Sequence, residues 1–240
     1  QNMVLDNCLS TIKHETIYYP NKIKQIIGRL NTQNLSEKEE REAVETITEL
    51  IEYYKGIFTI LSSCAARQLE EVTFRRTTIP VQELFDAAGK YFRKVMKNRM
   101  EKIELIMEPM EAKVIGDVNQ LRFLFENLID EALAVHEEGV IRLQARKDNE
   151  YVRFLFTDTR REKSVTELNQ LFYPNLARMT SGEKGELRGT EYLICKQIIR
   201  DHDEFAGRRG CRINAEPAEG GGFTVYFTIP LFRSSVFPRR

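Results

Sequence analysis

Two segments near the start of the chain carry apolar residues in alternating steps of four and three, and this repeat constrains the fold most strongly. The first segment covers residues 5–30 and the second covers residues 44–65. Such spacing places apolar side chains on one face of an α-helix. Residues 31–40, NTQNLSEKEE, break the repeat, and Ser36 followed by Glu39 fits a capping box that begins a new helix. The sequence therefore predicts a helical hairpin.

The second helix carries an apolar stripe that is too wide for a single hairpin to bury. Pairing two hairpins into a four-helix bundle would cover such a stripe. We therefore expect residues 1–75 to form a hairpin that dimerises into a four-helix bundle. The residues that widen the stripe beyond the repeat are Leu50, Ile57, Ile60 and Cys64.

After Arg75 the pattern changes to alternating helices and strands, which predicts an α+β chain whose residues 76–240 form an α/β sandwich. Pro80 suits the first position of a helix that we expect to end at Met100. The first β-hairpin is expected to turn at Asp148-Asn149. The expected helices cover residues 81–100, 116–135 and 190–202, and the expected strands lie at 102–109 and in hairpins at 139–158 and 210–231.

Charge balance and hydropathy exclude several classes of partner. The chain has 36 Lys and Arg residues against 36 Asp and Glu residues, which gives no support for a nucleic-acid partner. No apolar run approaches the length of a membrane span, so we expect no membrane contact from this segment. The opening residues lack the charged and apolar regions of a signal peptide. The cysteines, which lack metal-ligand spacing and are expected to be reduced thiols, are Cys8, Cys64, Cys195 and Cys211.

His14 lies almost opposite the apolar face of the first expected helix. Helical residues advance by roughly 100° each, and His14 is two positions from both Ile12 and Thr16. An exposed imidazole beside a carboxylate is a competent nucleophile, and Glu15 is placed to fix its tautomer. Pro20 should bend the helix about one turn later. A solvated surface histidine without a chemical role is the alternative.

The segment HETIYYP, residues 14–20, resembles the H-box of sensor histidine kinases, and further segments follow in the order of that family. Residues 116–133 resemble the N-box helix, residues 154–174 the G1-box strand and F-box, and residues 188–202 the G2-box helix. The resemblance covers essentially the whole chain. It implies a dimerisation and phosphotransfer hairpin followed by an ATP-binding domain. It also implies that ATP phosphorylates His14 and that a response regulator takes the phosphoryl group onto an aspartate.

The resemblance also assigns nucleotide-binding residues, and several of them depart from the family pattern. Asn127 matches the first N-box asparagine, and Glu131 stands where a second asparagine would hold Mg²⁺. A carboxylate also ligates this ion. Ala134 replaces a basic residue that would meet phosphate. In the G1-box, Asp158 matches the aspartate beneath the adenine amino group, and Arg160 replaces the first glycine. Side-chain bulk there is expected to narrow the adenine pocket.

The G2-box shows the most damaging departure. Gly189 matches its first glycine, but Glu191 replaces the second, so a negative charge stands where phosphates should pass. At about 4 Å and an effective dielectric near 20, a like-charge pair costs ~4 kcal/mol. Lys184, in a glycine-bearing loop, is a candidate to replace part of the lost phosphate contacts. A solvated charge at a loop tip is the alternative for Lys184.

The sequence leaves two functions open. In the first, the chain is the cytoplasmic transmitter region of a histidine kinase, a homodimer that uses ATP and Mg²⁺. In the second, it is a pseudokinase scaffold or a phosphorelay protein with impaired or absent ATP binding. A third hypothesis, protein binding by an ATPase fold as in anti-sigma factors, fits the histidine-bearing hairpin less well. We expect this segment to be cytosolic, while anchoring of the parent protein in the inner membrane stays open.

Overall fold

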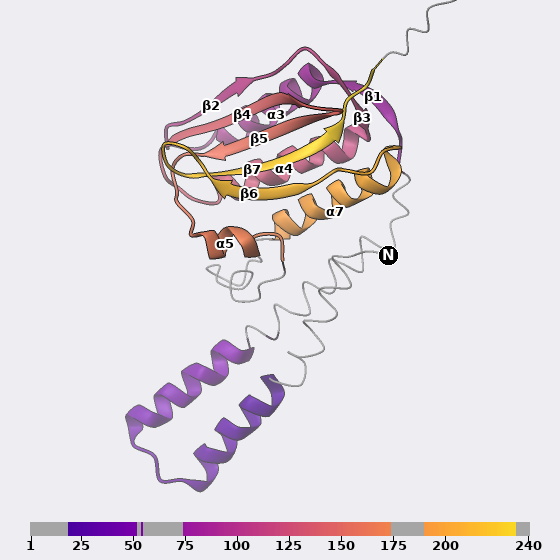
Figure 1. Cartoon of the computed structure of the whole chain (residues 1–240). Helices are drawn as coiled ribbons and strands as arrows, with labels where there is room; N and C mark the ends of the chain where they lie inside the picture. The colour runs from indigo at the N-terminus through magenta and orange to yellow at the C-terminus, as the bar shows by residue number, and fades with distance from the viewer. Residues whose placement is uncertain (1–18, 52–53, 55–73, 174–189, 234–240) are drawn as a thin grey trace, which may run out of the picture. The chain divides into compact units, whose positions relative to one another are not determined.

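The structure is a computed structural model that describes residues 19–51, 54, 74–173 and 190–233 (Figure 1). The chain divides into two compact units. One holds the helical hairpin and the other holds the mixed sheet with its helices. The division of function between residues 1–75 and 76–240 stays a prediction.

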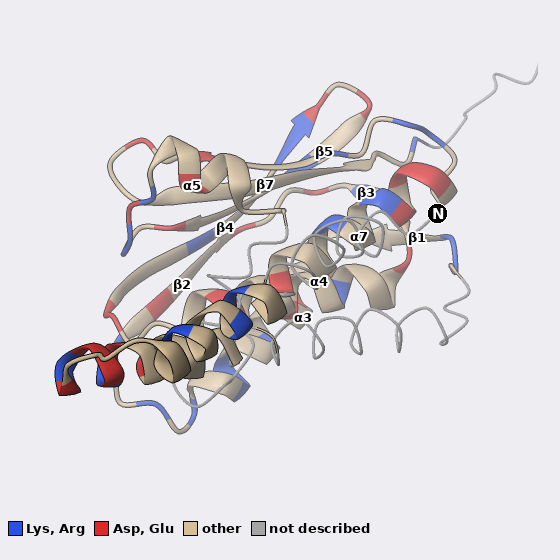
Figure 2. Ribbon diagram, turned by 90° about the horizontal axis from the view of Figure 1, so that it is seen from below, with Lys and Arg blue, Asp and Glu red and all other residues tan. Residues whose placement is uncertain are grey.

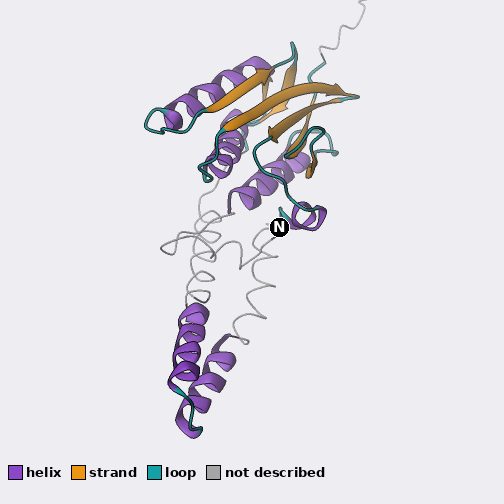
Figure 3. Cartoon of the chain, turned by 90° about the vertical axis from the view of Figure 1, so that its left-hand side faces the viewer, coloured by secondary structure: helices purple, strands orange, loops and turns teal. Residues whose placement is uncertain are grey.

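The described part of the hairpin consists of two helices, at residues 19–32 and 37–51 (Figures 1 and 3). The expected capping box is present at the start of the second helix. The carboxylate of Glu39 accepts a hydrogen bond from the backbone N–H of Ser36 at 2.8 Å, and the Ser36 hydroxyl accepts one from the Glu39 N–H at 3.3 Å. These bonds satisfy donors that a helix start leaves without partners. The helical hairpin is thus confirmed within the described residues, while its dimerisation stays a prediction.

The second unit is built on a sheet of five strands in the order β2-β4-β5-β7-β6. Strand β2 runs parallel to β4, and the other neighbours are antiparallel. A separate two-stranded sheet pairs β1 with β3. The strands are β1 (Thr77–Pro80), β2 (Ile103–Glu108), β3 (Lys113–Gly116), β4 (Gly139–Asp148), β5 (Tyr151–Asp158), β6 (Ile213–Pro217) and β7 (Phe223–Pro230).

Three long helices lie on the same side of the five-stranded sheet (Figures 1 and 2). Alternate residues of the central strands point toward these helices, because successive strand side chains face opposite ways. Phe154 of β5 stacks on Phe227 of β7 with ring centroids 5.0 Å apart. Phe125 packs edge-on against Phe154 at 5.7 Å. The helices are α3 (Val81–Met96), α4 (Val118–Leu133) and α7 (Thr190–Phe205), with a short helix α5 (Val165–Gln170) beyond β5.

These elements confirm the predicted α+β class, but several of them differ in detail from the prediction. Helix α3 ends at Met96 instead of Met100, because the chain turns so that Arg99 donates to the carbonyl of Leu133 at 2.5 Å. Pro80 precedes the helix as its N-cap and closes strand β1. The first hairpin turns one residue later than predicted, at residues 149–150, with Asn149 in the left-handed region at φ 54°. No helix among the described residues has the length and apolarity needed to cross a bilayer.

His202 of α7 is a buried histidine held in its neutral form. Its ring is fully buried. Its Nε2 accepts a hydrogen bond from the backbone N–H of Asp117 at 3.0 Å, and its Nδ1 pairs with the carbonyl of Ile198 at 2.7 Å, which requires a proton on Nδ1. Burial lowers the pKa of His202 from 6.5 to about 4. The ring therefore joins α7 to the start of α4 as an uncharged hydrogen-bonded bridge.

Acidification from pH 7.5 to 4.5 is expected to lower the free energy of unfolding by about 2–3 kcal/mol through His202. In this window the unfolded histidine takes up a proton while the folded one does not, so stability is present above pH 6.5 and is lost toward pH 4. Urea unfolding followed by circular dichroism at several pH values measures the change. The exposed His136 provides the control, because His136→Gln should keep the pH dependence that His202→Gln removes.

Candidate functional site

Asp158 is the last residue of β5 and the most deeply buried carboxylate at the candidate site. Alternation along the strand places it on the helix-facing side together with Phe154 and Phe156. Its side chain is 1 % exposed. A buried carboxylate is stable only when it is paired and hydrogen-bonded. The neighbours of Asp158 therefore decide what this position can bind.

The partner of Asp158 is Arg160, two residues along the same chain. Arg160 Nε lies 2.9 Å from Oδ1 and its Nη2 lies 2.9 Å from Oδ2, which is a bidentate ion pair. The backbone N–H of Arg160 donates to Oδ1 at 3.0 Å as well. The guanidinium side chain is also only 1 % exposed. Arg161 approaches Oδ2 more loosely, at 3.7 Å, and is 21 % exposed. Both carboxylate oxygens of Asp158 are therefore occupied by the chain itself.

Arg160 also binds the loop that follows helix α4. Its Nη2 donates to the carbonyl of Ala132 at 2.6 Å and its Nη1 to the carbonyl of Glu137 at 2.9 Å. Gly139, at the start of β4, lies beneath the arginine stem, and a Cβ built on this glycine would lie 2.8 Å from Arg160 Cγ. Arg160 thus connects the end of β5 to the end of α4 and the start of β4.

Asn127 and Glu131 lie four positions apart on α4 and so share a face of that helix. Asn127 is buried, and its Nδ2 donates to the carbonyl of Phe123 within the same helix at 2.7 Å. Among the described residues, no cluster of three or more His, Cys, Asp or Glu side chains could hold a metal ion. The expected Mg²⁺ ligands are thus two residues of one helix, and the hydrogen bond of Asn127 uses Nδ2 and not Oδ1, the atom that would bind the ion.

Negative charge gathers where α4 faces the start of α7. Desolvation raises the pKa of Asp130, and the charge of Glu191 adds to this rise, while a hydrogen bond from the Tyr91 hydroxyl at 2.7 Å opposes it. Glu191 lies in the first turn of α7. A carboxylate in that turn complements the positive end of the helix dipole, which would otherwise favour an anion such as phosphate. The charges of Asp130 and Glu191 are therefore close enough to interact.

Four of the residues singled out from the sequence, His14, Glu15, Lys184 and Gly189, lie outside the described residues. The structure places the other three, Asn127, Glu131 and Asp158, in the second unit. The sequence predicted that the bulk of Arg160 narrows the adenine pocket, but it did not predict the ion pair of Arg160 with Asp158. It also missed Gly139 as the space for the arginine stem. The available signal was an arginine two residues after the aspartate that ends a strand. This signal is weak when the fold is not known.

The surroundings of Asp158 do not fit adenine in the manner that the resemblance implies. An adenine amino group needs an accessible carboxylate oxygen as its acceptor, but Arg160 pairs with both oxygens of Asp158 and the two side chains are each only 1 % exposed. A phosphate at the first turn of α7 would meet the carboxylate of Glu191. Ala134 offers no cation in its place.

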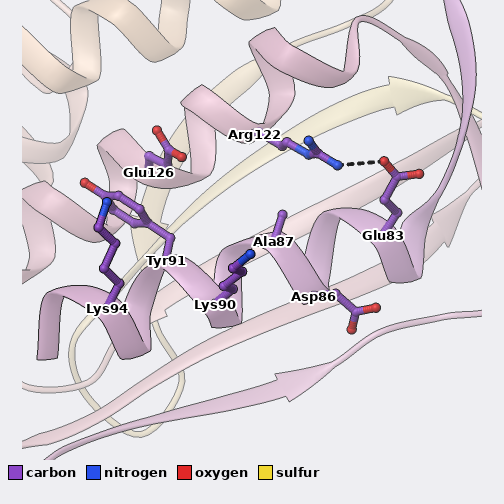
Figure 4. Close-up of a pocket in the computed structure, with 8 residues that line it drawn as sticks. All are labelled: Glu83, Asp86, Ala87, Lys90, Tyr91, Lys94, Arg122 and Glu126. Atoms are coloured by element: carbon purple, nitrogen blue, oxygen red, sulfur yellow. Dashed lines mark hydrogen bonds and ion pairs between the residues drawn. The ribbon is translucent and has the colours of Figure 1, made fainter. Parts of the chain in front are cut away.

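A cavity of about 730 Å³ lies between α3 and α4 (Figure 4). The ion pair of Arg122 with Glu83, at 2.8 Å, spans the two helices beside it. None of Asn127, Asp158 and Arg160 lines this cavity, so it is separate from the expected nucleotide position. Its lining residues are Glu83, Asp86, Ala87, Lys90, Tyr91, Lys94, Arg122 and Glu126.

Comparison with protein families gives one match for the second unit. Residues 116–233 match the family model described as histidine kinase-, DNA gyrase B- and HSP90-like ATPase. This range runs from the end of β3 through β7 and includes Asp158 and the Arg160 ion pair. A comparison with curated proteins found no match. The family match confirms the predicted histidine-kinase type of ATPase fold for this domain.

Solved structures of histidine kinases share the fold at low sequence identity. The catalytic domain of histidine kinase ThkA is 20 % identical, with a TM-score of 0.52, and the match covers 65 % of this chain and 95 % of that one. Acinetobacter baumannii histidine kinase AdeS is 12 % identical, with a TM-score of 0.51, over 92 % of this chain and 98 % of that one. Histidine kinase ThkA in complex with response regulator protein TrrA is 18 % identical, with a TM-score of 0.53, over 95 % and 62 %.

Proposed function

We propose that this chain, whose residues 116–233 match the histidine kinase-, DNA gyrase B- and HSP90-like ATPase family, is the transmitter region of a two-component signalling protein. His14 is its phosphoacceptor, and a response regulator is its partner. The observation that carries the proposal is the order of parts in one chain. A helical hairpin with a histidine-bearing segment precedes an ATPase-family domain. The similarity to a histidine kinase solved with a response regulator supports the choice of partner.

The active form is a homodimer of the hairpin. Ile27, Val44 and Ile51 are between 41 % and 55 % exposed on the described part of its helices. Apolar side chains repeated along helices are covered when two hairpins pair into a four-helix bundle. Such a bundle leaves the face opposite the apolar stripe open to solvent, which is the face of His14. A response regulator can then reach the phosphorylated histidine.

The proposed chemistry is phosphoryl transfer through an imidazole nitrogen. A ring nitrogen of His14 attacks the phosphorus of a donor, and Glu15 accepts a hydrogen bond from the other ring nitrogen and so stabilises the developing positive charge. In the second step a regulator aspartate attacks the same phosphorus. The N–P bond breaks, an O–P bond forms on the aspartate, and neutral imidazole leaves. Glu15 acts here as a positioning residue.

Incubation with potassium phosphoramidate is expected to place acid-labile phosphate on His14. The P–N bond of the donor breaks, ammonia leaves, and the phosphoryl group joins the imidazole. Mass spectrometry of peptides and ³¹P NMR locate the label, and an added receiver domain should then remove it. His14→Gln should abolish the label.

The matched control is His136→Gln, which should keep the label because His136 is an exposed histidine outside the hairpin. The chain has only three histidines, and His202 is fully buried. Label that persists in His14→Gln, or that no receiver domain removes, would contradict the proposed function.

An ATP-dependent histidine kinase is the second candidate. The family match and the presence of Asn127 and Asp158 at their expected positions favour it. It predicts that ATP with Mg²⁺ labels His14 as readily as phosphoramidate does. The ion pair between Asp158 and Arg160 makes us favour the phosphorelay or scaffold form of the transmitter instead.

A further inference from the structure

We propose that the side chain of Arg160 fills the subsite where adenine would bind. As a result, the ATPase-type domain does not bind adenine nucleotides. This inference goes beyond the proposed function, because phosphoryl transfer through His14 does not require it. It rests on the ion pair of Arg160 with Asp158, on the carbonyls that Arg160 holds, and on the charges of Asp130 and Glu191.

Most of the hydrogen-bond donors of Arg160 are paired within the protein. Four of its five guanidinium N–H groups have partners, two on Asp158 and one each on the carbonyls of Ala132 and Glu137. The side chains of Arg160 and Asp158 are each only 1 % exposed. A nucleotide that took over Asp158 would leave a buried guanidinium without its anion. Breaking a buried ion pair in this way should weaken binding on the order of a thousandfold.

The backbone around the pair is shaped to hold the arginine. Gly139 has φ +140°, and a Cβ at this position would lie 2.8 Å from Arg160 Cγ. Any other residue at 139 would push the arginine stem from its place. The long side chain of Arg160 therefore packs in the space that the missing side chain of Gly139 leaves.

The phosphate side of the site opposes nucleotides independently of Arg160. Glu191 occupies the first turn of α7, and its charge reaches Asp130 on α4. A nucleotide phosphate there would meet like charges with no compensating cation from Ala134. Arg160 and Glu191 thus act on different parts of a nucleotide, and adenosine, which has no phosphate, tests the adenine end alone.

Isothermal titration of the full chain with ATP and Mg²⁺, ADP and adenosine tests the proposal. We expect no saturable binding of any of the three up to millimolar concentration, and no shift of the melting temperature. Saturable binding of ATP or ADP with a micromolar dissociation constant would overturn the proposal. The phosphoramidate experiment on His14 is unaffected by either result, so failure of this inference and failure of the proposed function remain distinguishable.

Arg160→Gly tests which residue closes the adenine subsite. Removal of the guanidinium frees Asp158, and we expect adenosine to bind at least tenfold more tightly than to the wild-type chain. The control is Arg161→Gly, which removes a neighbouring arginine with a looser contact and should not create adenosine binding. A folded Arg160→Gly protein that binds adenosine no better than wild type would overturn the role of Arg160. If this variant does not fold, the titration of the wild-type chain still decides the proposal.

Discussion

Arg160→Ala should lower the free energy of unfolding by about 3–5 kcal/mol, because it leaves Asp158 as a buried charge without its partner. The loss has further sources, since Arg160 also holds the carbonyls of Ala132 and Glu137. Arg161→Ala should cost only about 1 kcal/mol or less, because Arg161 is 21 % exposed and lies 3.7 Å from the carboxylate. Thermal or urea unfolding of the two variants beside the wild-type chain measures the difference.

Because the two arginines are adjacent in the sequence and identical in charge, net charge and unfolded-state effects cancel between these variants. Equal losses for both would show that Asp158 does not depend on Arg160. A further check is Asp158→Asn with Arg160 retained, which leaves the arginine as the uncompensated charge and should also be strongly destabilising. The three variants together measure how much stability is lost when either partner of the ion pair is removed.

Gly222→Ala should destabilise the domain by about 3 kcal/mol or more, through backbone strain and a direct clash. Gly222 has φ +82°, and a Cβ there would lie 2.0 Å from the carbonyl oxygen of Asp158 and 2.7 Å from Cα of Thr159. Both are backbone atoms, which cannot turn aside as a flexible side chain can. The substitution therefore forces β7 away from the end of β5, where the Asp158 site is located.

Gly220→Ala is the matched control for this substitution. Gly220 has a similar φ of +89°, but no atom lies within 4 Å of the position of its Cβ. Gly220→Ala should lower the free energy of unfolding by about 1–2 kcal/mol, which is the cost of the left-handed conformation alone. The difference between the two variants in urea unfolding isolates the contact with β5. Similar losses in both would mean that β7 tolerates displacement at this point.

The sequence predicted the long elements because their side chains repeat with a clear period. Helix α4 and the hairpin of β4 with β5 follow their expected ranges closely, since apolar spacing fixes which face packs on the core. The short strands β1 and β3 were not predicted. Each has only four residues, which are too few to show an alternation. The two strands pair with each other although helix α3 and strand β2 lie between them in the sequence.

The sequence identified residues of the site, but it did not predict that Arg160 is buried and paired with Asp158. Asp158 was found because it ends an apolar strand, and the loss of glycine at position 160 was visible in the sequence. An arginine after a strand is usually solvated, so the burial of Arg160 could not be expected from local pattern. It depends on carbonyls at Ala132 and Glu137, which only the tertiary fold brings close to residue 160.

A crystal structure of the full chain grown with millimolar ADP and Mg²⁺ tests the closed adenine subsite most directly. We predict that the guanidinium of Arg160 remains paired with both oxygens of Asp158, at distances near 2.9 Å, with no adenine at the end of β5. Adenine hydrogen-bonded to Asp158, with the Arg160 side chain turned out to solvent, would contradict the closed site and would favour the ATP-dependent kinase.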